Sequence, residues 1–379
     1  MSQDQEISQG PDKKDSAGKT GSRRAVSLII AFLCIALALF VFVFVQRLLM
    51  PKYQRGVIEG SFTEEYYKEK VPHDVIFYGD CDVYENYSPI ELYEKYGISS
   101  YIRGNSEQYM WQTYYMLKDT LRTETPKVVV ISVHGLQSGT KPKEAYNRMT
   151  LDGMAWTPDK VNAIRESMTE GETFLSYVFP ILRYHDRWSE LTSSDWQHVF
   201  AKNITSHNGY YMRCDIMPQG DFPPAIPLMD YSFDDKSMEY LAKCVDLCKE
   251  RGIGVVLVHA PIVYPTWYDE WDEQVKDFAA QHDVTYFNYI EHIDDIGLDM
   301  SRDTYDAGLH LNIYGAEKLS DYIGQWLCAN YDLRDMRQDD KVSAVYQEKI
   351  RFYEAMRDDQ LSEIEQYGQL VNYGANAIE

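Results

Sequence analysis

The sequence is poor in cysteine and in basic residues. Its 379 residues include six cysteines, with no CxxC pair and no Cys/His spacing of the kind that binds zinc, so we expect no metal site and no other cofactor. A secreted domain held by disulfides would show a tighter cysteine framework. Lys and Arg (37) are outnumbered by Asp and Glu (59), for a formal net charge of -22. This acidity argues against a nucleic-acid partner.

One long apolar run stands near the amino end. Residues 25–45 (AVSLIIAFLCIALALFVFVFV) are uncharged, and about 20 apolar residues cross a bilayer. Basic residues within 13–24 favour a cytoplasmic amino end. A cleaved signal peptide is the alternative, but its apolar core would be shorter and a small-residue cleavage site would follow. The pattern predicts a disordered cytoplasmic tail (1–24), a single-pass signal anchor in the cell membrane (25–45) and an extracytoplasmic remainder.

The remainder divides into a stalk (46–70), a globular domain (71–330) and a helical extension (331–379). Within the domain, strand-like segments alternate with helical ones. The strands are expected at 75–78, 99–103, 127–133, 253–259 and 284–288. This alternation predicts an α/β fold, a three-layer α/β/α sandwich around a five-stranded parallel sheet with right-handed crossovers.

Three further segments complete the expected organisation. Ser106 is expected to cap a helix that runs to about Leu121. Residues 139–234 interrupt the alternation, and we interpret them as an insertion able to form one wall of a site. Residues 341–366 form a charged helix that either packs back on the domain or pairs with a partner. Its thin apolar stripe contains Val345, Ile350, Tyr353, Met356 and Ile364.

Two loops carry residues suited to covalent catalysis. The first strand ends in Gly79-Asp80-Cys81, and junctions of this kind lift a nucleophile above the carboxyl edge of a sheet. His310 precedes the last helix of the domain, in a loop expected at the same edge. A nucleophile and a base brought together in this way meet the geometric requirement for acyl transfer, with an acid to orient the imidazole.

These blocks resemble the SGNH/GDSL hydrolase superfamily, whose fold is flavodoxin-like. The resemblance covers roughly 71–329 and rests on Gly79-Asp80-Cys81, Gly104-Asn105 and the late block 306–318 (DAGLHLNIYGAEK). The anchor and outward-facing domain are similar to the teichoic acid D-alanyl transfer protein and to alginate O-acetylation proteins. The resemblance implies a cell-envelope polysaccharide as substrate and a membrane-bound O-acyltransferase as partner.

The resemblance also implies roles for individual residues. Cys81 stands at the position of the family's nucleophilic Ser, and His310 matches the base. The family acid usually lies three residues before the His, where this chain has Ala307. Asp306 and Asp303 are the nearest acids, and we assign the orienting role to Asp306.

The oxyanion donors are only partly matched. Gly104 corresponds to the second-block Gly whose N–H helps to form the oxyanion hole. The third-block Asn, expected after 127–133, is replaced by His134-Gly135. Asn105 or Asn147 is left to supply that donor, and we choose Asn105.

The chemistry of Cys81 is open to three interpretations. A free thiol has a pKa of about 8.5 and needs a cation or a helix amino end to lower it. Asp80, Asp82 and Glu85 surround it in sequence and would raise the pKa, whereas a close His310 would lower it. Cys81 is therefore either an active nucleophile or a small buried residue in a retired active site, and a different residue acting as the nucleophile is the third alternative.

Substrate contacts are predicted from three residues. Arg148 in the insertion is a candidate for an anionic or polyol substrate, although a solvated surface Arg is the alternative. Trp267 and Tyr268 follow the fourth strand and form either a platform for a sugar or the core face of the next helix. His134, His207 and His259 are expected to be structural.

The sequence thus predicts a membrane-anchored, extracytoplasmic acyl-transfer protein, an O-acyltransferase or O-acyl esterase acting on a cell-envelope polysaccharide. A catalytically degenerate domain that binds glycan or docks on a membrane-bound O-acyltransferase is the alternative.

Overall fold

The computed structural model describes residues 15–51, 61–138, 143–201, 204 and 206–374. Its centre is a five-stranded, fully parallel sheet in the order β2-β1-β3-β4-β5. The strands are β1 (Val75–Gly79), β2 (Ser100–Gly104), β3 (Val128–Ser132), β4 (Gly254–His259) and β5 (Thr285–Asn288). The predicted parallel sheet and all five strands are confirmed. The sequence could locate β1, β3 and β4 because these buried parallel strands are nearly continuous runs of β-branched and other apolar residues.

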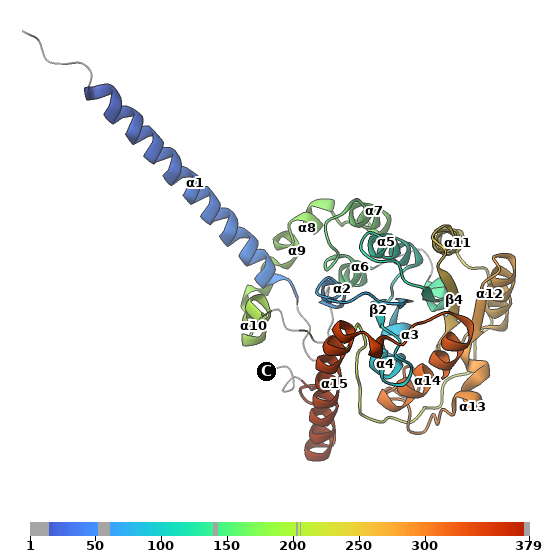
Figure 1. The fold of residues 1–379 in the computed structure, drawn as a ribbon. Coiled ribbons are helices and arrows are strands. Elements are labelled where there is room, and N and C mark those ends of the chain that lie inside the picture. Colours follow the sequence, from blue (N-terminus) through green and yellow to red (C-terminus); the bar gives the residue numbers. More distant parts are fainter. Residues whose placement is uncertain (1–14, 52–60, 139–142, 202–203, 205, 375–379) are drawn as a thin grey trace, which may run out of the picture.

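Helices cover both faces of the sheet, as Figure 1 shows. Successive residues of β1 point to opposite sides, so Phe77 joins one core cluster and Tyr78 the other. The Phe77 side is covered by α4 (Pro89–Tyr96), α14 (Ile313–Asn330) and α15 (Asp340–Tyr367). The Tyr78 side is covered by α5 (Met110–Thr120), α7 (Pro158–Ser167), α11 (Asp235–Glu250) and α12 (Asp269–Gln281). The three-layer sandwich is therefore confirmed.

The helix expected from Ser106 begins later than predicted. Its first residue is Met110, because Tyr109 takes the N-cap position and the Gln112 side chain accepts from the Tyr109 N–H. The Ser106 hydroxyl instead bonds the hydroxyl of Tyr84 at 2.7 Å.

The remaining short helices are α2 (Ser61–Tyr66), α3 (Cys81–Tyr84), α6 (Glu144–Leu151), α8 (Phe174–Val178), α9 (Ile181–Tyr184), α10 (Ser193–Ala201) and α13 (Ile293–Ile296), with 3-10 turns at His134–Ser138, His185–Ser189, Tyr289–His292 and Met336–Gln338.

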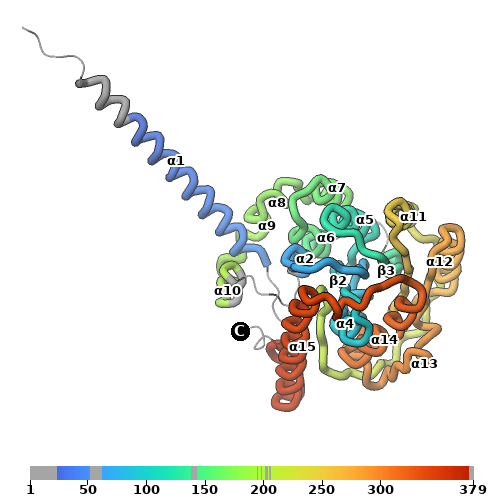
Figure 2. The backbone as a smooth tube through the Cα atoms, in the orientation of Figure 1, coloured from blue at the N-terminus to red at the C-terminus, as the bar shows by residue number. Residues whose placement is uncertain are grey.

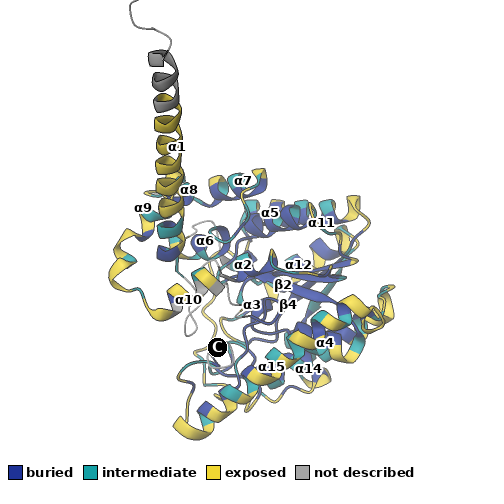
Figure 3. Ribbon diagram, turned by 60° about the vertical axis from the view of Figure 1, so that its left-hand side comes forward, coloured by how far each residue is buried: buried dark blue, intermediate teal, exposed yellow. Residues whose placement is uncertain are grey.

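The amino-terminal helix α1 (Asp15–Leu49) differs from the prediction at both ends. Residues 15–24, predicted to be disordered, continue the helix of the apolar run, while 1–14 lie outside the described residues. Among the described residues, Arg24–Leu49 is the helix long and apolar enough to cross a membrane. It projects from the domain (Figure 2), and its described side chains are exposed except at the carboxyl end, where they are covered (Figure 3).

Little of the predicted stalk stands free. Leu48 and Leu49 are buried at the end of α1, and Phe62 and Tyr66 of α2 are buried in the domain. The globular part therefore includes 61–70, because this segment carries apolar side chains that need cover; 52–60 lie outside the described residues.

The charged helix α15 packs back on the domain, which decides between the two predicted alternatives. Tyr346 stacks on Tyr93 with ring centroids 3.8 Å apart, and its hydroxyl accepts from the Ser100 N–H at 3.1 Å. Tyr353 and Met356 of the predicted stripe are also buried.

Candidate functional site

Cys81 stands where the order of the strands reverses. The chain passes from β1 to β2 on one side and returns to β3 on the other, and such switch points are where open α/β sheets bind ligands. Cys81 opens α3 directly after β1, with Asp80 as N-cap accepting from the Asp82 N–H at 3.1 Å. A Cβ on Gly79 would lie 2.6 Å from the Ser132 Cβ, so only glycine fits at this junction.

The loop before α14 brings His310 beside Cys81, close enough for the imidazole to lower the pKa of the thiol and for the sulfur to raise the pKa of the imidazole. His310 Nδ1 lies 2.6 Å from Asp306 Oδ2, and its backbone N–H donates to Asp306 Oδ1 at 2.7 Å. Nδ1 is thereby occupied, which leaves Nε2 for the thiol. The predicted Cys81, His310 and Asp306 therefore meet in one place, in the order nucleophile, base, acid.

Asp306, and not Asp303, is the acid beside His310. The buried carboxylate of Asp303 accepts from the Asp299 N–H at 2.8 Å and from Lys318 Nζ at 2.6 Å, so it holds the loop together. Ala307 has a positive φ of 64°, and this turn carries the chain from Asp306 back towards His310. A left-handed turn here accounts for the acid standing four residues before the histidine.

Asn86 is a positioning residue that the sequence reading missed. Its side chain is buried, accepts from the Leu311 N–H at 2.8 Å and donates to the Asp82 carbonyl at 3.2 Å. It therefore ties the His310 loop to α3, the helix that carries Cys81. A polar residue just after a nucleophile turn is the only sequence signal for this role.

The electrostatics of the site favour a protonated thiol. Burial and the Asp80 carboxylate raise the pKa of Cys81 to about 12, although His310 acts in the opposite direction. Burial disfavours the imidazolium of His310, but Glu85, Cys81 and Asp306 outweigh it and raise the pKa of His310 well above its usual value. Burial raises the pKa of Glu85, whose Oε2 lies 3.7 Å from His310 Nδ1. The free protein therefore holds a thiol beside an imidazolium near neutral pH.

A second polar cluster lies behind Cys81, at the ends of β3 and β4. His134 Nδ1 lies 2.7 Å from Asp80 Oδ2. Burial opposes protonation of His134, but Asp80 and Asp82 raise its pKa to about 9. Asp82 Oδ2 accepts from the Ser132 hydroxyl and the Ala260 N–H, each at 3.2 Å, and so joins α3 to both strand ends. His134 thus stands in an ion pair beside the predicted nucleophile, where the resemblance called for an Asn.

Among the described residues, Asp80, Cys81 and His134 also form the one group able to hold a metal ion. Their ligand atoms lie within 4.8 Å of one another, and carboxylate, thiolate and imidazole together suit zinc. In this structure the Asp80–His134 hydrogen bond already uses two of the three groups. The predicted lack of a metal stays a prediction.

The predicted oxyanion donors have unequal geometry. Gly104 lies close against the nucleophile turn, since a Cβ there would be 3.0 Å from the Gly79 carbonyl oxygen. The Asn105 amide donates to Thr63 Oγ1 at 3.1 Å and to Gln108 Oε1 at 3.4 Å, which leaves its oxygen, an acceptor, without a partner. An acceptor cannot stabilise an oxyanion, so this arrangement does not support the predicted role of Asn105. The other candidate, Asn147, donates to the Ser167 carbonyl, within the insertion.

The placement of Arg148 argues against its predicted role in substrate binding. The side chain is buried and lies 3.6 Å above the Tyr177 ring. Its guanidinium bonds Asp152 Oδ1 at 3.1 Å and the Ser176 hydroxyl at 2.5 Å. These contacts hold the insertion together, which explains an Arg in a segment with few aliphatic core residues.

Of the aromatic pair after β4, only Trp267 takes one of the two predicted places. Trp267 belongs to the core: it is buried, and its ring lies 4.1 Å from the ring of His259. Tyr268 is half-buried, and its hydroxyl donates to the Ile226 carbonyl at 2.7 Å. A sugar platform built from both residues is therefore not supported.

The insertion does form one wall of the His310 loop. The Met217 N–H donates to the Thr304 carbonyl at 2.9 Å, and the Gly220 N–H donates to the Ala307 carbonyl at 3.0 Å. The Arg213 guanidinium lies 4.1 Å above the Tyr305 ring. These contacts support the turn that presents Asp306.

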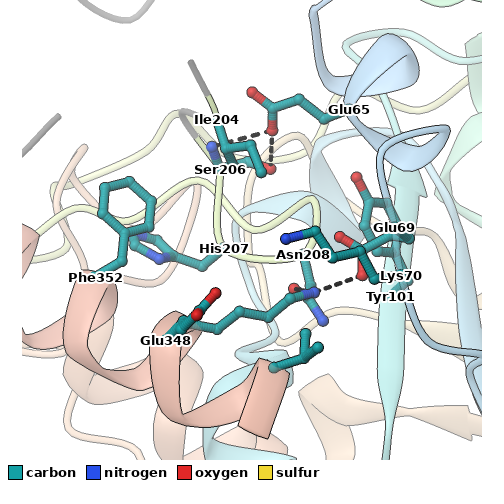
Figure 4. A pocket seen from close by; sticks show the side chains of 12 residues that line it. Glu65, Glu69, Lys70, Tyr101, Ile204, Ser206, His207, Asn208, Glu348 and Phe352 are labelled. Carbon is teal, nitrogen blue, oxygen red and sulfur yellow. Dashed lines mark hydrogen bonds and ion pairs between the residues drawn. The ribbon is translucent and has the colours of Figure 1, made fainter. Parts of the chain in front are cut away.

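A cavity of about 270 Å³ lies apart from this site, between α2, the segment around Asn208 and α15 (Figure 4). Its polar side chains bond one another: Lys349 Nζ contacts Glu69 Oε2 at 2.5 Å and Asn208 Oδ1 at 2.6 Å. The residues predicted for catalysis or binding do not line it.

No protein-family model and no curated protein matches the chain. Solved structures that are similar include a GDSL-like lipase from Bacteroides thetaiotaomicron (12% identity, TM-score 0.34, 72% of this chain and 99% of that chain). Another is AlinE4, an SGNH-hydrolase family esterase (13% identity, TM-score 0.28, 69% of this chain and 97% of that chain). Both are SGNH/GDSL hydrolases by name. At these identities and TM-scores the similarity assigns no activity and no residue role to this chain.

Proposed function

We propose that the protein is a membrane-anchored, extracytoplasmic acyl-transfer enzyme that moves or removes an O-linked acyl group on a cell-envelope polysaccharide. The observation that carries the proposal is the meeting of Cys81, His310 and Asp306 at the switch point of the sheet. Thiol, imidazole and carboxylate in this order form the arrangement that activates a nucleophile for attack on an ester.

The proposed reaction proceeds through a thioester. The Cys81 sulfur attacks the ester carbonyl as its proton passes to His310. The tetrahedral intermediate collapses, and the departing alkoxide takes that proton. An acceptor hydroxyl, or water, then attacks the thioester while giving its proton to His310, and the leaving sulfur recovers a proton. Asp306 orients the imidazole and stabilises its charged form.

The reactive form holds one proton fewer than the form favoured near neutral pH. The free protein has a neutral Cys81 thiol beside a protonated His310. Attack needs either a neutral thiol beside a neutral imidazole or a thiolate beside an imidazolium. These two forms hold the same number of protons, one fewer than the free protein. Raising the pH removes the extra proton. We therefore expect the transfer rate to rise from neutral towards alkaline pH.

The polysaccharide substrate and a membrane-bound O-acyltransferase as acyl source are parts of this proposal. They follow from the resemblance noted in the sequence and from a helix able to cross the membrane beside the domain. The amino end would lie in the cytoplasm and the domain outside the cell.

Ester cleavage by the purified full chain tests the proposal. The wild type, Cys81→Ala, His310→Ala and a matched control, His292→Ala at the half-buried end of the 3-10 turn Tyr289–His292, are given an acetylated oligosaccharide and p-nitrophenyl acetate. We expect release of acetate or its transfer to sugar from the wild type and the control, and at least a 100-fold loss in the two site variants. Equal rates in all four proteins would contradict it.

The second candidate function is a non-catalytic partner that binds glycan or docks on a membrane-bound O-acyltransferase. It is favoured by the pKa of Cys81, which burial and Asp80 raise to about 12. It is also favoured by the Asn105 amide, which donates to Thr63 and is therefore not available to an oxyanion. In that case the wild type would be as inactive as Cys81→Ala, yet both would retain the same polysaccharide on an affinity column.

A further inference from the structure

The segment from α8 to α10 carries apolar side chains that the domain leaves uncovered. Trp188 is 73% exposed and Phe200 is 74% exposed, and Leu175, Leu182 and Trp196 are exposed as well. Soluble surfaces rarely gather large apolar side chains in this way. We name residues 174–201 the juxtamembrane segment.

This segment lies beside the end of α1. Figure 3 shows α8, α9 and α10 around the base of that helix. The Phe44 ring contacts the rings of Trp196 (6.1 Å) and Phe200 (5.8 Å), and the Phe42 ring lies 5.9 Å from that of Phe179. Ile181 of α9 lines the same apolar groove as Val41 and Cys34 of α1.

The contacts set the depth of the segment if α1 crosses the bilayer. The apolar run ends at Val45, and at 1.5 Å per residue Phe42 lies about 5 Å and Val41 about 6 Å inward of it. Side chains that touch these residues from outside the helix must lie at a similar depth. Amphipathic segments at a membrane surface bury their apolar face by about 5–10 Å.

The described carboxyl end of α1 is covered and does not stand free of the domain. Gln46, Leu48 and Leu49 follow the run directly and are buried in the structure. Arg187 Nη1 donates to the Leu49 carbonyl at 2.7 Å, which fixes the end of α1 against the juxtamembrane segment. The domain must therefore stand flush with the membrane surface.

We propose that the juxtamembrane segment inserts its apolar side chains into the outer surface of the lipid bilayer and forms a second membrane contact beside α1. The two contacts together would hold the domain in one orientation, because a single helix allows rotation and tilt. The partner is the lipid itself. The two arginines of the segment are already paired, Arg187 with Asp195 at 3.1 Å and Arg183 with Glu144 at 2.9 Å, so the contact is apolar and does not call for anionic headgroups.

Tryptophan fluorescence of the reconstituted full chain tests this proposal. The sequence of α1 contains no Trp, so quenching by brominated phosphatidylcholine reports on the domain alone. Carbonate-resistant flotation with the vesicles first establishes that α1 is inserted. We expect quenching that is stronger with bromine near the headgroup than near the chain end, and unchanged when phosphatidylglycerol is added.

The variants are chosen so that the quenched residues can be assigned. The double substitution Trp188→Phe with Trp196→Phe should remove at least half of the quenching. Trp326→Phe, on α14 against Phe287, is the matched control and should leave it unchanged. Absence of quenching in wild type inserted in pure lipid would overturn the proposal and point to a protein partner. So would equal quenching in the double variant and the wild type, or failure of the chain to float.

Discussion

At the scale of single residues, few groups hold the loop of His310 against the helix of Cys81. Asp306 binds both the ring and the backbone of His310, while Asn86 joins the histidine loop to the helix of Cys81. The sequence could identify Cys81, His310 and Asp306, because each stands at a strand end or before a helix. It could not identify Asn86 or the Asp80–His134 pair, since these contacts join residues whose distance only the folded chain sets.

The reactivity of Cys81 should depend steeply on pH. Because burial and Asp80 raise its pKa to about 12, the thiolate fraction should grow about tenfold per pH unit from pH 8 to pH 10. Iodoacetamide labelling followed by peptide mass spectrometry measures this rate. Asp80→Asn removes a negative charge, lowers the pKa of the thiol and should speed labelling at pH 8. A rate that levels off below pH 9 in the wild type would contradict the assignment.

At the scale of elements, strand ends and helix faces were predictable where local chemistry decides them. Ser88 caps α4 and Gly97 closes it, as their types indicate. The predicted helix cap at Ser106 was wrong because the Ser106 hydroxyl forms a hydrogen bond with the Tyr84 hydroxyl instead. The predictions for Arg148 and Trp267 failed for the same reason, because tertiary packing decides where these side chains lie. The insertion encloses Arg148, and the core around His259 encloses Trp267.

The turn after β1 should tolerate no side chain at Gly79. An alanine Cβ would lie 2.6 Å from the Ser132 Cβ, and overpacking of this kind costs about 1–3 kcal/mol in the free energy of unfolding. Urea unfolding of Gly79→Ala in detergent measures the loss. Gly220→Ala is the control, because its Cβ would meet only Ala307 at 3.6 Å. Equal stability of the two variants would argue against this description of the turn.

The attachment of α15 should depend on Tyr346. Replacing it with Ala removes a ring stacked 3.8 Å from Tyr93 and should cost about 3–5 kcal/mol in the free energy of unfolding. Glu348→Ala, at an exposed position of the same helix, should change stability by no more than about 0.5 kcal/mol. Thermal unfolding of both variants separates packing from helix propensity; a Tyr346→Ala protein as stable as the control would contradict the packing.

At the scale of the whole molecule, the prediction of the sheet and its layers was right, whereas the prediction of a free stalk over residues 46–70 was mostly wrong. Burial of Leu48, Leu49, Phe62 and Tyr66 brings the domain against the end of α1. A polar, charged stretch such as 46–70 resembles a linker in composition, and only the fold shows that its few apolar residues are covered.

The side of the membrane on which the domain lies can be read from Cys328. This thiol is exposed on α14, whereas Cys214, Cys244 and Cys248 are buried. If the domain is extracytoplasmic, a membrane-impermeant maleimide should label intact cells, and Cys328→Ser should abolish most of the label. Labelling that requires lysed cells would place the domain inside.

The central claim is that Cys81 carries an acyl group, and intact-protein mass spectrometry tests it most directly. The full chain is incubated with an activated acetyl ester at pH 9 and quenched in acid. We expect a mass gain of one acetyl group on Cys81 that hydroxylamine removes, that Cys81→Ala lacks and that His310→Ala forms at least 100-fold more slowly. A wild-type protein that gains no such group, or gains it equally in Cys81→Ala, would contradict the claim.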